Sequence, residues 1–392
     1  MTYRKLKADI LFDGHKMFPS DTVLICSPEG KIEEMIHEAD AGGDIEKFPG
    51  LIVPGLINCH CHLELSHLQG LIPEKQGLVN FVLSLMGQRF KDFPMKRKAI
   101  QNAETGMMNV GIVAVGDICN TADTGLVKQA KKLNYYNFIE LLGWAPEQAS
   151  ERFEAGRKLA ATFIEMGMNT NYISLSPHAP YSVSDKLWEM MKTGFADKTI
   201  SIHNQEAAAE NEFFVSGTGD LVSMYAKMKL PPGQFQIPGI RSLPYYLSKL
   251  KEAAKVLLVH NTFMAEEDIV EAMEFKKDLF FCFCPNANEY IENRLPDIPL
   301  FLKHNARIVL GTDSLASNHQ LNILEEMKTI KKTYPGISSL DMLIWATSNG
   351  AEALGFNSTL GDFGKGKKPG IVLIENLSGA EIGAESKSRR LV

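Results

Sequence analysis

Eight short apolar runs alternate with longer segments of helical period between residues 56 and 356, and this alternation constrains the fold more than any other feature of the chain. Repeated strand–helix units are typical of an α/β protein with a parallel sheet. Eight such units predict a (β/α)8 barrel of the TIM type. The expected strands are residues 56–62, 112–120, 136–144, 172–178, 199–206, 256–262, 279–285 and 307–314.

Helical segments separate these strands, and polar residues crowd the last positions of nearly every strand. In a barrel the carboxyl ends of the strands meet at one rim, where the following loops carry the chemistry. An open doubly wound sheet is the competing α/β architecture, but it gives no reason for strands to end so regularly in a histidine or a carboxylate. The expected helices include residues 151–167, 185–193, 266–275 and 322–334.

The two ends of the chain have a different pattern. Residues 1–50 and 362–392 consist of short strands and turns, and we expect them to form one small β domain, a β-sandwich made by both chain ends. Residues 51–361 then form the catalytic barrel. The polar tail, residues 383–392, is expected to fray.

Composition excludes several classes of function. The 392 residues include 41 Lys plus Arg against 47 Asp plus Glu, a formal net charge of -6 without long runs of either sign, which argues against nucleic-acid binding. No stretch approaches the roughly 18 apolar residues that a membrane span needs. The six cysteines lack the regular spacing of a disulfide framework, so we expect reduced thiols in a cytoplasmic protein.

His60 and His62 lie two residues apart on an expected strand, so that both side chains leave the same face and can reach one ion. Two satisfied core or surface histidines are the alternative. Metal binding is favoured because His203 and Asp313 also end strands, and a barrel brings these ends together.

His203 and Glu206 are three residues apart, a spacing that would place them on opposite faces of a regular strand. The strand must therefore stop near His203. The following turn can then bring the Glu206 carboxylate beside a metal ion, close enough to act on a water molecule. The alternative is a solvated glutamate in the first turn of the next helix.

Five further motifs stand along the chain: PGLINCHCHLELS, SLSPHAPYSVS, SIHNQEAAAE, LLVHNTF and GTDSLASN. Together they resemble the motifs of the amidohydrolase superfamily. Within it, the chain is similar to the deaminase and chlorohydrolase branch, which includes deaminases of adenosine, S-adenosylhomocysteine, aminodeoxyfutalosine and guanine as well as triazine hydrolases. The resemblance covers essentially the whole chain.

The resemblance implies one divalent metal ion, with zinc as the first choice and iron or manganese as alternatives. It makes Glu206 the proton shuttle and His260 the partner of the water, while Asp313 both binds the metal and receives the second proton. Relatives with two metals use a carboxylated lysine at the end of the fourth strand, and residues 169–181 contain no lysine. The implied metal ligands are His60, His62, His203 and Asp313.

The resemblance also implies substrate contacts. Glu64, Phe81 and Arg89 are among them, and each has an alternative role. Glu64 could instead hold a ligand histidine through its carboxylate, and Phe81 and Arg89 could belong to a plain core stripe on a helix. Two departures lie near the loop after the seventh strand, Ala287 in place of a usual serine and 292–294 in place of a glycine-rich turn. The predicted contacts are Glu64, Phe81, Arg89, His178, Asn288 and Ser317.

The predicted function is hydrolytic deamination of an aminated purine, with a 5′-modified adenosine such as aminodeoxyfutalosine as the first choice and ammonia as a product. Deamination of guanine, a pterin or another free base, or dechlorination of an aromatic heterocycle, is the alternative. A non-catalytic scaffold would be expected to have lost ligands. The sequence leaves a homodimer open, and a carboxylate on the substrate would meet Arg89 first, then Arg294 or Arg241.

Overall fold

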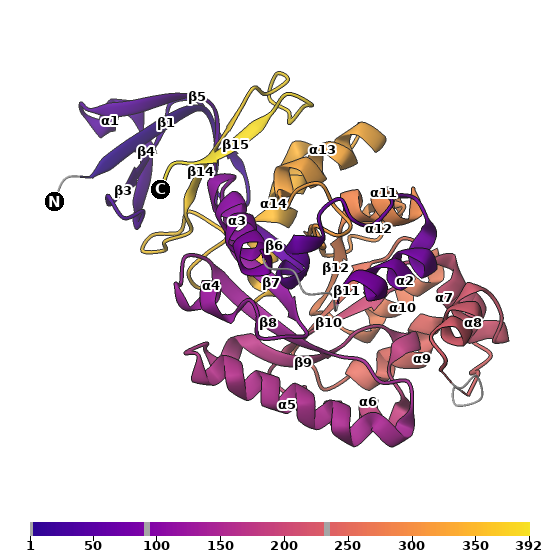
Figure 1. Cartoon of the computed structure of the whole chain (residues 1–392). Helices are drawn as coiled ribbons and strands as arrows, with labels where there is room; N and C mark the ends of the chain where they lie inside the picture. Colours follow the sequence, from indigo (N-terminus) through magenta and orange to yellow (C-terminus); the bar gives the residue numbers. More distant parts are fainter. Residues whose placement is uncertain (1–2, 90–94, 231–235) are drawn as a thin grey trace.

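The computed structural model describes residues 3–89, 95–230 and 236–392 (Figure 1). Eight parallel strands form two four-stranded sheets, each in sequence order, which confirms the α/β class and the predicted parallel strands. Every predicted strand overlaps one of the eight. One sheet contains β6 (Leu56–Cys61), β7 (Ile112–Cys119), β8 (Asn134–Leu141) and β9 (Ile173–Pro177), and the other contains β10 (Thr199–Asn204), β11 (Lys255–His260), β12 (Leu279–Phe283) and β13 (Ile308–Leu310).

Backbone hydrogen bonds connect the two sheets at both edges. The amide of His203 in β10 donates to the carbonyl of His178, just after β9, at 2.9 Å. The amides of Thr312 and Asp313, just after β13, donate to the carbonyl of His60 in β6 at 3.0 and 3.1 Å. The regular strand ladders still define two sheets, so the single closed barrel stays a prediction at this level.

The strands are buried because both of their faces are covered, as their nearly continuous apolar sequences require. Helices lie around the parallel strands in Figure 1. The four helices predicted with stated limits correspond to α5, α6, α10 and α13, with ends that differ by two residues or fewer. The longer helices are α2 (Gly77–Arg89), α3 (Lys96–Asn109), α5 (Ala149–Glu165), α6 (Asp185–Lys192), α7 (Ala208–Ser216), α8 (Asp220–Lys227), α10 (Glu266–Phe275), α11 (Pro285–Glu292), α13 (Ile323–Thr333) and α14 (Ser339–Ala346).

Short helices complete the connections. They are α1 (Glu38–Ala41), α4 (Gly125–Gln129), α9 (Ser242–Leu247), α12 (Ile298–Lys303) and α15 (Ser348–Ala353), with 3-10 turns at Leu63–Leu68, Pro146–Gln148, Thr170–Tyr172, Pro180–Ser182 and Ser248–Leu250.

Both ends of the chain contribute to one seven-stranded sheet, ordered β15-β14-β5-β1-β3-β4 with β2 beside β1 (Figure 1). A sandwich of two layers stays a prediction. The tail was expected to fray, and this is wrong, because β15 pairs antiparallel with β14 and thereby satisfies its backbone groups. The strands are β1 (Arg4–Phe12), β2 (Met17–Phe18), β3 (Thr22–Cys26), β4 (Ile32–His37), β5 (Ile45–Pro54), β14 (Ile371–Glu375) and β15 (Lys387–Arg390).

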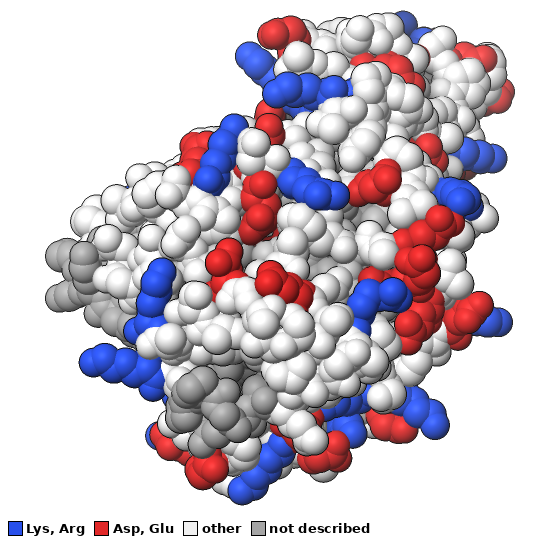
Figure 2. All heavy atoms as spheres, turned by 90° about the vertical axis from the view of Figure 1, so that its right-hand side faces the viewer, with Lys and Arg blue, Asp and Glu red and all other residues white. Residues whose placement is uncertain are grey.

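Three further observations bear on the composition argument. All six cysteines are buried and free, as predicted. In the part of the chain that the structure describes, no helix is both long enough and apolar enough to cross a membrane. Figure 2 shows Lys and Arg side chains interspersed with Asp and Glu on the visible face, without the broad basic surface that nucleic-acid binding requires.

Candidate metal centre and active site

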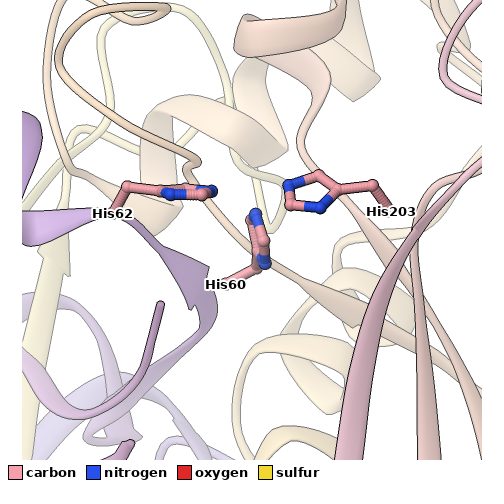
Figure 3. A group of neighbouring side chains, drawn as sticks. All are labelled: His60, His62 and His203. Atoms are coloured by element: carbon pink, nitrogen blue, oxygen red, sulfur yellow. The ribbon is translucent and has the colours of Figure 1, made fainter. Parts of the chain in front are cut away.

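Three histidines converge at the carboxyl ends of the strands, His60 in β6, His62 just after it and His203 in β10. Figure 3 shows the imidazoles of His60, His62 and His203 turned toward one another. One ring nitrogen from each lies within 4.8 Å of the others. Asp313 joins them, with its Oδ1 atom 3.3 Å from Nε2 of His62 and 3.6 Å from Nε2 of His60. The four predicted ligands therefore lie together.

The close approach of β13 to β6 depends on one glycine. A Cβ atom on Gly311 would lie 2.8 Å from the Cβ of His60 and 2.9 Å from the Sγ of Cys284. Because Asp313 follows two residues later, any larger side chain at this position would push the carboxylate away from the histidines. Asp313 itself has a positive φ of 56°, a left-handed conformation that is uncommon outside glycine and typical of functional sites.

The hydrogen bonds of the histidines fit a metal ion. Within the described ranges, neither ring nitrogen of the fully buried His60 has a hydrogen-bond partner, which is costly for a polar group away from water. His203 uses Nδ1 against the carbonyl oxygen of His178 at 2.8 Å, which leaves Nε2 free as a ligand. Three imidazoles and one carboxylate form a donor set that suits a divalent ion such as zinc.

The protonation states agree with this assignment. Burial lowers the pKa of His60 and of His62 to about 3, so both imidazoles are neutral and can donate a lone pair. Burial alone would raise the pKa of Asp313, but the imidazoles of His60 and His62 beside it outweigh this effect and hold that pKa well below its usual range. Neutral imidazoles with an ionised carboxylate are the forms that bind metal.

A pH dependence of stability follows for the metal-free protein. The folded pKa of His60 lies below the ordinary value of 6.5, so the unfolded state binds more protons and stability falls as the pH drops from about 6.5 toward about 3. Between about pH 7.5 and about pH 5 we expect His60 to account for a loss of about 2 kcal/mol in the free energy of unfolding. Urea denaturation gives the free energy of unfolding of the wild type and of His60→Gln at both pH values. The fall between the two pH values should be larger in the wild type, and the difference between the two proteins is the contribution of His60. Equal losses in the two proteins contradict it, and His15→Gln, at an exposed histidine, is the control.

Glu206 and His260 face each other beside the metal ligands. Their Oε1 and Nε2 atoms are 3.6 Å apart, and both side chains are buried. Burial raises the pKa of Glu206 to about 8, so that the carboxyl group can both hold and release a proton near neutral pH. β10 ends at Asn204, and Gln205 has a positive φ of 43°, so the strand stops just after His203 as the spacing predicted.

Asn288 and Ser317 contact the side chains of His260 and Asp313. The amide oxygen of Asn288 accepts a hydrogen bond from Nδ1 of His260 at 3.0 Å, while its amide nitrogen donates to the hydroxyl of Thr262. The hydroxyl of Ser317 donates to Oδ2 of Asp313. These contacts orient the side chains that they touch, and the predicted substrate contacts of Asn288 and Ser317 stay predictions.

Glu64 lies in the 3-10 turn after β6, is almost fully buried and already has hydrogen-bond partners. Its carboxylate accepts hydrogen bonds from Arg89 and from the backbone amides of Asn120 and Thr121 at 3.1 and 2.9 Å. Arg89 also donates to the side-chain oxygen of Asn120 at 2.6 Å. The last residue of α2 is thereby fixed to the loop after β7.

His178 and Phe81 lie in different surroundings. The ring centroid of His178 is 4.7 Å from that of His203, and its Nδ1 contacts the hydroxyl of Ser182 at 2.8 Å. Phe81 is packed in an apolar cluster that includes Ala207, the residue after Glu206. A role of His178 and of Phe81 in substrate binding stays a prediction.

The sequence analysis missed Glu140 and Asn120. Oε1 of Glu140, in β8, lies 3.7 Å from Nδ1 of His203, and its Oε2 accepts a hydrogen bond from Asn120 at 3.0 Å. Together with His178 and His203, Glu140 forms a second close group of potential metal ligands. The available signal was a carboxylate among the apolar residues at the end of the third predicted strand, Phe138, Ile139 and Leu141.

Histidines and a carboxylate gathered at the carboxyl ends of parallel strands, with a buried acid beside them, define a metal-dependent hydrolytic type of site. The model of the Amidohydrolase family matches residues 51–387, and the chain belongs to this family. The superfamily resemblance seen in the sequence is thereby confirmed.

Curated relatives are similar over most of their length. An aminodeoxyfutalosine deaminase of Deinococcus radiodurans is 26% identical over 90% of this chain and 86% of the relative. A 5′-deoxyadenosine deaminase of Methanococcus vannielii is 25% identical over 83% and 74%, respectively.

Solved structures share the fold. The aminofutalosine deaminase of Helicobacter pylori in complex with methylthio-coformycin has a TM-score of 0.82 at 20% identity and covers 95% of this chain and 92% of its own. An adenosine deaminase of Xanthomonas campestris with bound zinc has a TM-score of 0.73 at 20% identity, with coverage of 95% and 84%.

Proposed function

We propose that this protein is a metal-dependent deaminase that hydrolyses the amino group of a 5′-modified adenosine, such as aminodeoxyfutalosine, and releases ammonia. The observation that carries the proposal is the convergence of the histidine and aspartate cluster with Glu206 and His260 in one buried site. The relatives named as deaminases of aminodeoxyfutalosine and 5′-deoxyadenosine support the choice of substrate.

We also propose that the two parallel sheets form one closed (β/α)8 barrel over residues 51–361, with a small β domain from residues 1–50 and 362–392. The hydrogen bonds at both edges of the sheets support the closure. The solved relatives, whose family has a TIM-barrel fold, support the same architecture.

The metal is held in this proposal by three imidazoles and the Asp313 carboxylate. A divalent ion bound there lowers the pKa of a water molecule from about 15.7 to about 7. Glu206 takes a proton from the water and delivers it to the ring nitrogen beside the carbon that carries the amino group. His260, fixed by Asn288, orients the water through Nε2. Asp313 receives the second proton and passes it to the amino group, which leaves as ammonia when the C–N bond breaks.

Zinc is the first choice for the ion, since three neutral imidazoles and one carboxylate suit it, with iron or manganese as alternatives. Metal analysis of the purified protein distinguishes them. Size-exclusion chromatography tests whether the protein is a homodimer.

Ammonia release from a panel of substrates tests the proposed function. The panel contains aminodeoxyfutalosine, S-adenosylhomocysteine, adenosine, guanine and cytosine, offered to protein of known metal content. We expect the highest kcat/KM for a 5′-modified adenosine. A preference for guanine or another free base contradicts the choice of substrate, and no release from any compound contradicts the deaminase activity.

A carboxylate on the substrate gives a further prediction. Arg294 is exposed and lies over the ring of Phe263, whereas Arg241 is paired with Asp268 and Arg89 with the buried Glu64. Arg294→Met is therefore the cleaner variant, because Arg89→Met also leaves a buried carboxylate without its cation.

If Arg294 binds the benzoate of aminodeoxyfutalosine, Arg294→Met lowers kcat/KM for that substrate by an amount that corresponds to about 1.5–3 kcal/mol of lost transition-state stabilisation. The value of kcat/KM for adenosine is then unchanged. For Arg89→Met we expect losses on both substrates, with a larger loss on aminodeoxyfutalosine if this arginine also meets the carboxylate. Equal losses on the two substrates in both variants contradict a carboxylate contact, and steady-state kinetics with each substrate decides.

A further inference from the structure

Glu326 of α13 is a completely buried carboxylate that none of the proposed metal contacts or proton transfers uses. Its Oε2 accepts a hydrogen bond from the backbone amide of Asn286 at 2.8 Å. Its Oε1 accepts two more, from the side-chain amide of Asn286 at 3.0 Å and from that of Asn318 at 2.8 Å. One side chain thus binds the segments that follow two different strands, β12 and β13.

The first segment leads to His260. Asn286 lies in the first turn of α11, two residues before Asn288, which holds Nδ1 of His260. The hydroxyl of Thr329, also on α13, donates to the side-chain oxygen of Asn286 and fixes the orientation of that amide. The position of α11 therefore sets where the Asn288 oxygen meets the imidazole.

The second segment leads to Asp313. The side-chain amide of Asn318 also donates to the backbone carbonyl of Thr312 at 2.9 Å, directly before Asp313. Ser317, the neighbour of Asn318, donates to the Asp313 carboxylate. Asn318 thus closes the loop in which Asp313 has its left-handed backbone conformation.

We propose that Glu326 is a positioning residue that ties the loops after β12 and β13 together and so sets the mutual placement of His260 and Asp313. The roles of these two side chains in catalysis rest on the proposed function, whereas the placement of a metal ligand by Glu326 does not depend on the substrate. Groups that hydrogen-bond a metal ligand typically change metal affinity or activity by about 10–100-fold. Glu326 acts through Asn286 and Asn318, so an effect at the lower end of this range, about 10-fold, is expected.

Burial raises the pKa of Glu326 to about 8, and the N–H donors of Asn286 and Asn318 act in the opposite direction. Because three N–H groups point at its two oxygens, the contacts favour the ionised carboxylate. Both oxygens of Glu326 accept from N–H groups, and a carboxylate is the side chain that only accepts. A glutamine has the same shape, but its amide nitrogen would face one of these donors without an acceptor. Glu326→Gln therefore loses at least one of the three hydrogen bonds and places two N–H groups against each other, while it leaves the volume of the buried side chain nearly unchanged.

The experiment compares Glu326→Gln with Glu325→Gln, a control on the same helix whose side chain instead pairs with Lys328 at 2.7 Å. Two readouts are measured, the affinity for Zn²⁺ against a competing chelator and the separate values of kcat and KM. Glu326→Gln is expected to bind Zn²⁺ about 10-fold more weakly and to lose about 10-fold in kcat, with KM nearly unchanged. Glu325→Gln should match the wild type. Wild-type Zn²⁺ affinity and kcat in Glu326→Gln overturn the proposal.

Two further variants, each of which removes one side-chain hydrogen-bond partner of Glu326, test the connection between the two loops. Asn318→Ala is expected to weaken Zn²⁺ binding, and Asn286→Ala to lower kcat, while neither adds to the loss in a Glu326→Gln background, because the residues act as one unit. Fully additive losses overturn the proposal. If Glu326→Gln does not fold, wild-type values in both single variants overturn it. Absence of ammonia release by the wild type would contradict only the proposed function, because the Zn²⁺ measurement needs no substrate.

Discussion

The Glu206→Gln variant is expected to keep its metal ion and to lose about 10²–10⁴-fold in kcat, the usual contribution of a positioned acid–base group. Glutamine preserves the size of the side chain and leaves the four ligands untouched, but it cannot take a proton from water. The raised pKa of Glu206, about 8 through burial, is the property that the substitution removes. Metal analysis and single-turnover kinetics on the same preparation measure both parts of the result.

Glu212→Gln is the matched control, since Glu212 is an exposed glutamate on the helix that follows Glu206. It should behave as the wild type. If Glu206→Gln turns over at nearly the wild-type rate, Glu206 is only a structural residue at the beginning of that helix.

The second large effect is expected at the metal ligands. His203→Ala and Asp313→Ala should each lose the ion that the wild type holds at about one per chain, because a four-ligand site without one ligand binds far more weakly. Activity should disappear with the metal and should return only in part at high metal concentration.

His304→Ala serves as the control for histidine removal, since His304 lies outside the cluster and contacts Glu266 at 2.7 Å. It should retain the metal. Two tightly bound ions per wild-type chain would contradict the single-ion site, and the group formed by Glu140, His178 and His203 is where a second ion would be sought.

The order of the strands and the gathering of the metal ligands could be predicted because both follow from local patterns. Buried parallel strands are apolar along their whole length, and each polar side chain at a strand end is conspicuous against that background. The spacing of His203 and Glu206 also predicted where β10 ends, since both could not reach one site from a regular strand.

The partners of the site residues could not be predicted in the same way. The hydrogen bonds of Glu64 with Arg89 and of Glu326 with Asn318 depend on loops whose conformations no sequence period encodes. Glu140 was overlooked because it lies within β8, between Ile139 and Leu141, and does not follow the strand. The ordered tail was missed because polar edge strands resemble disordered segments in composition.

The candidate ligands come from distant parts of the sequence. His60 and His62 lie at the end of β6 and just after it, whereas His203 lies in β10 and Asp313 in the loop after β13. A bound ion would therefore act as a thermodynamic link between the two sheets, stabilising their association only when both are in place. At a free metal concentration of about 1,000 times the dissociation constant, this linkage adds about 4.1 kcal/mol to the stability of the folded chain. The resistance of the protein to heat and to proteases should then depend on the metal supply of the cell. Under metal starvation, both the activity and the amount of the folded protein should fall.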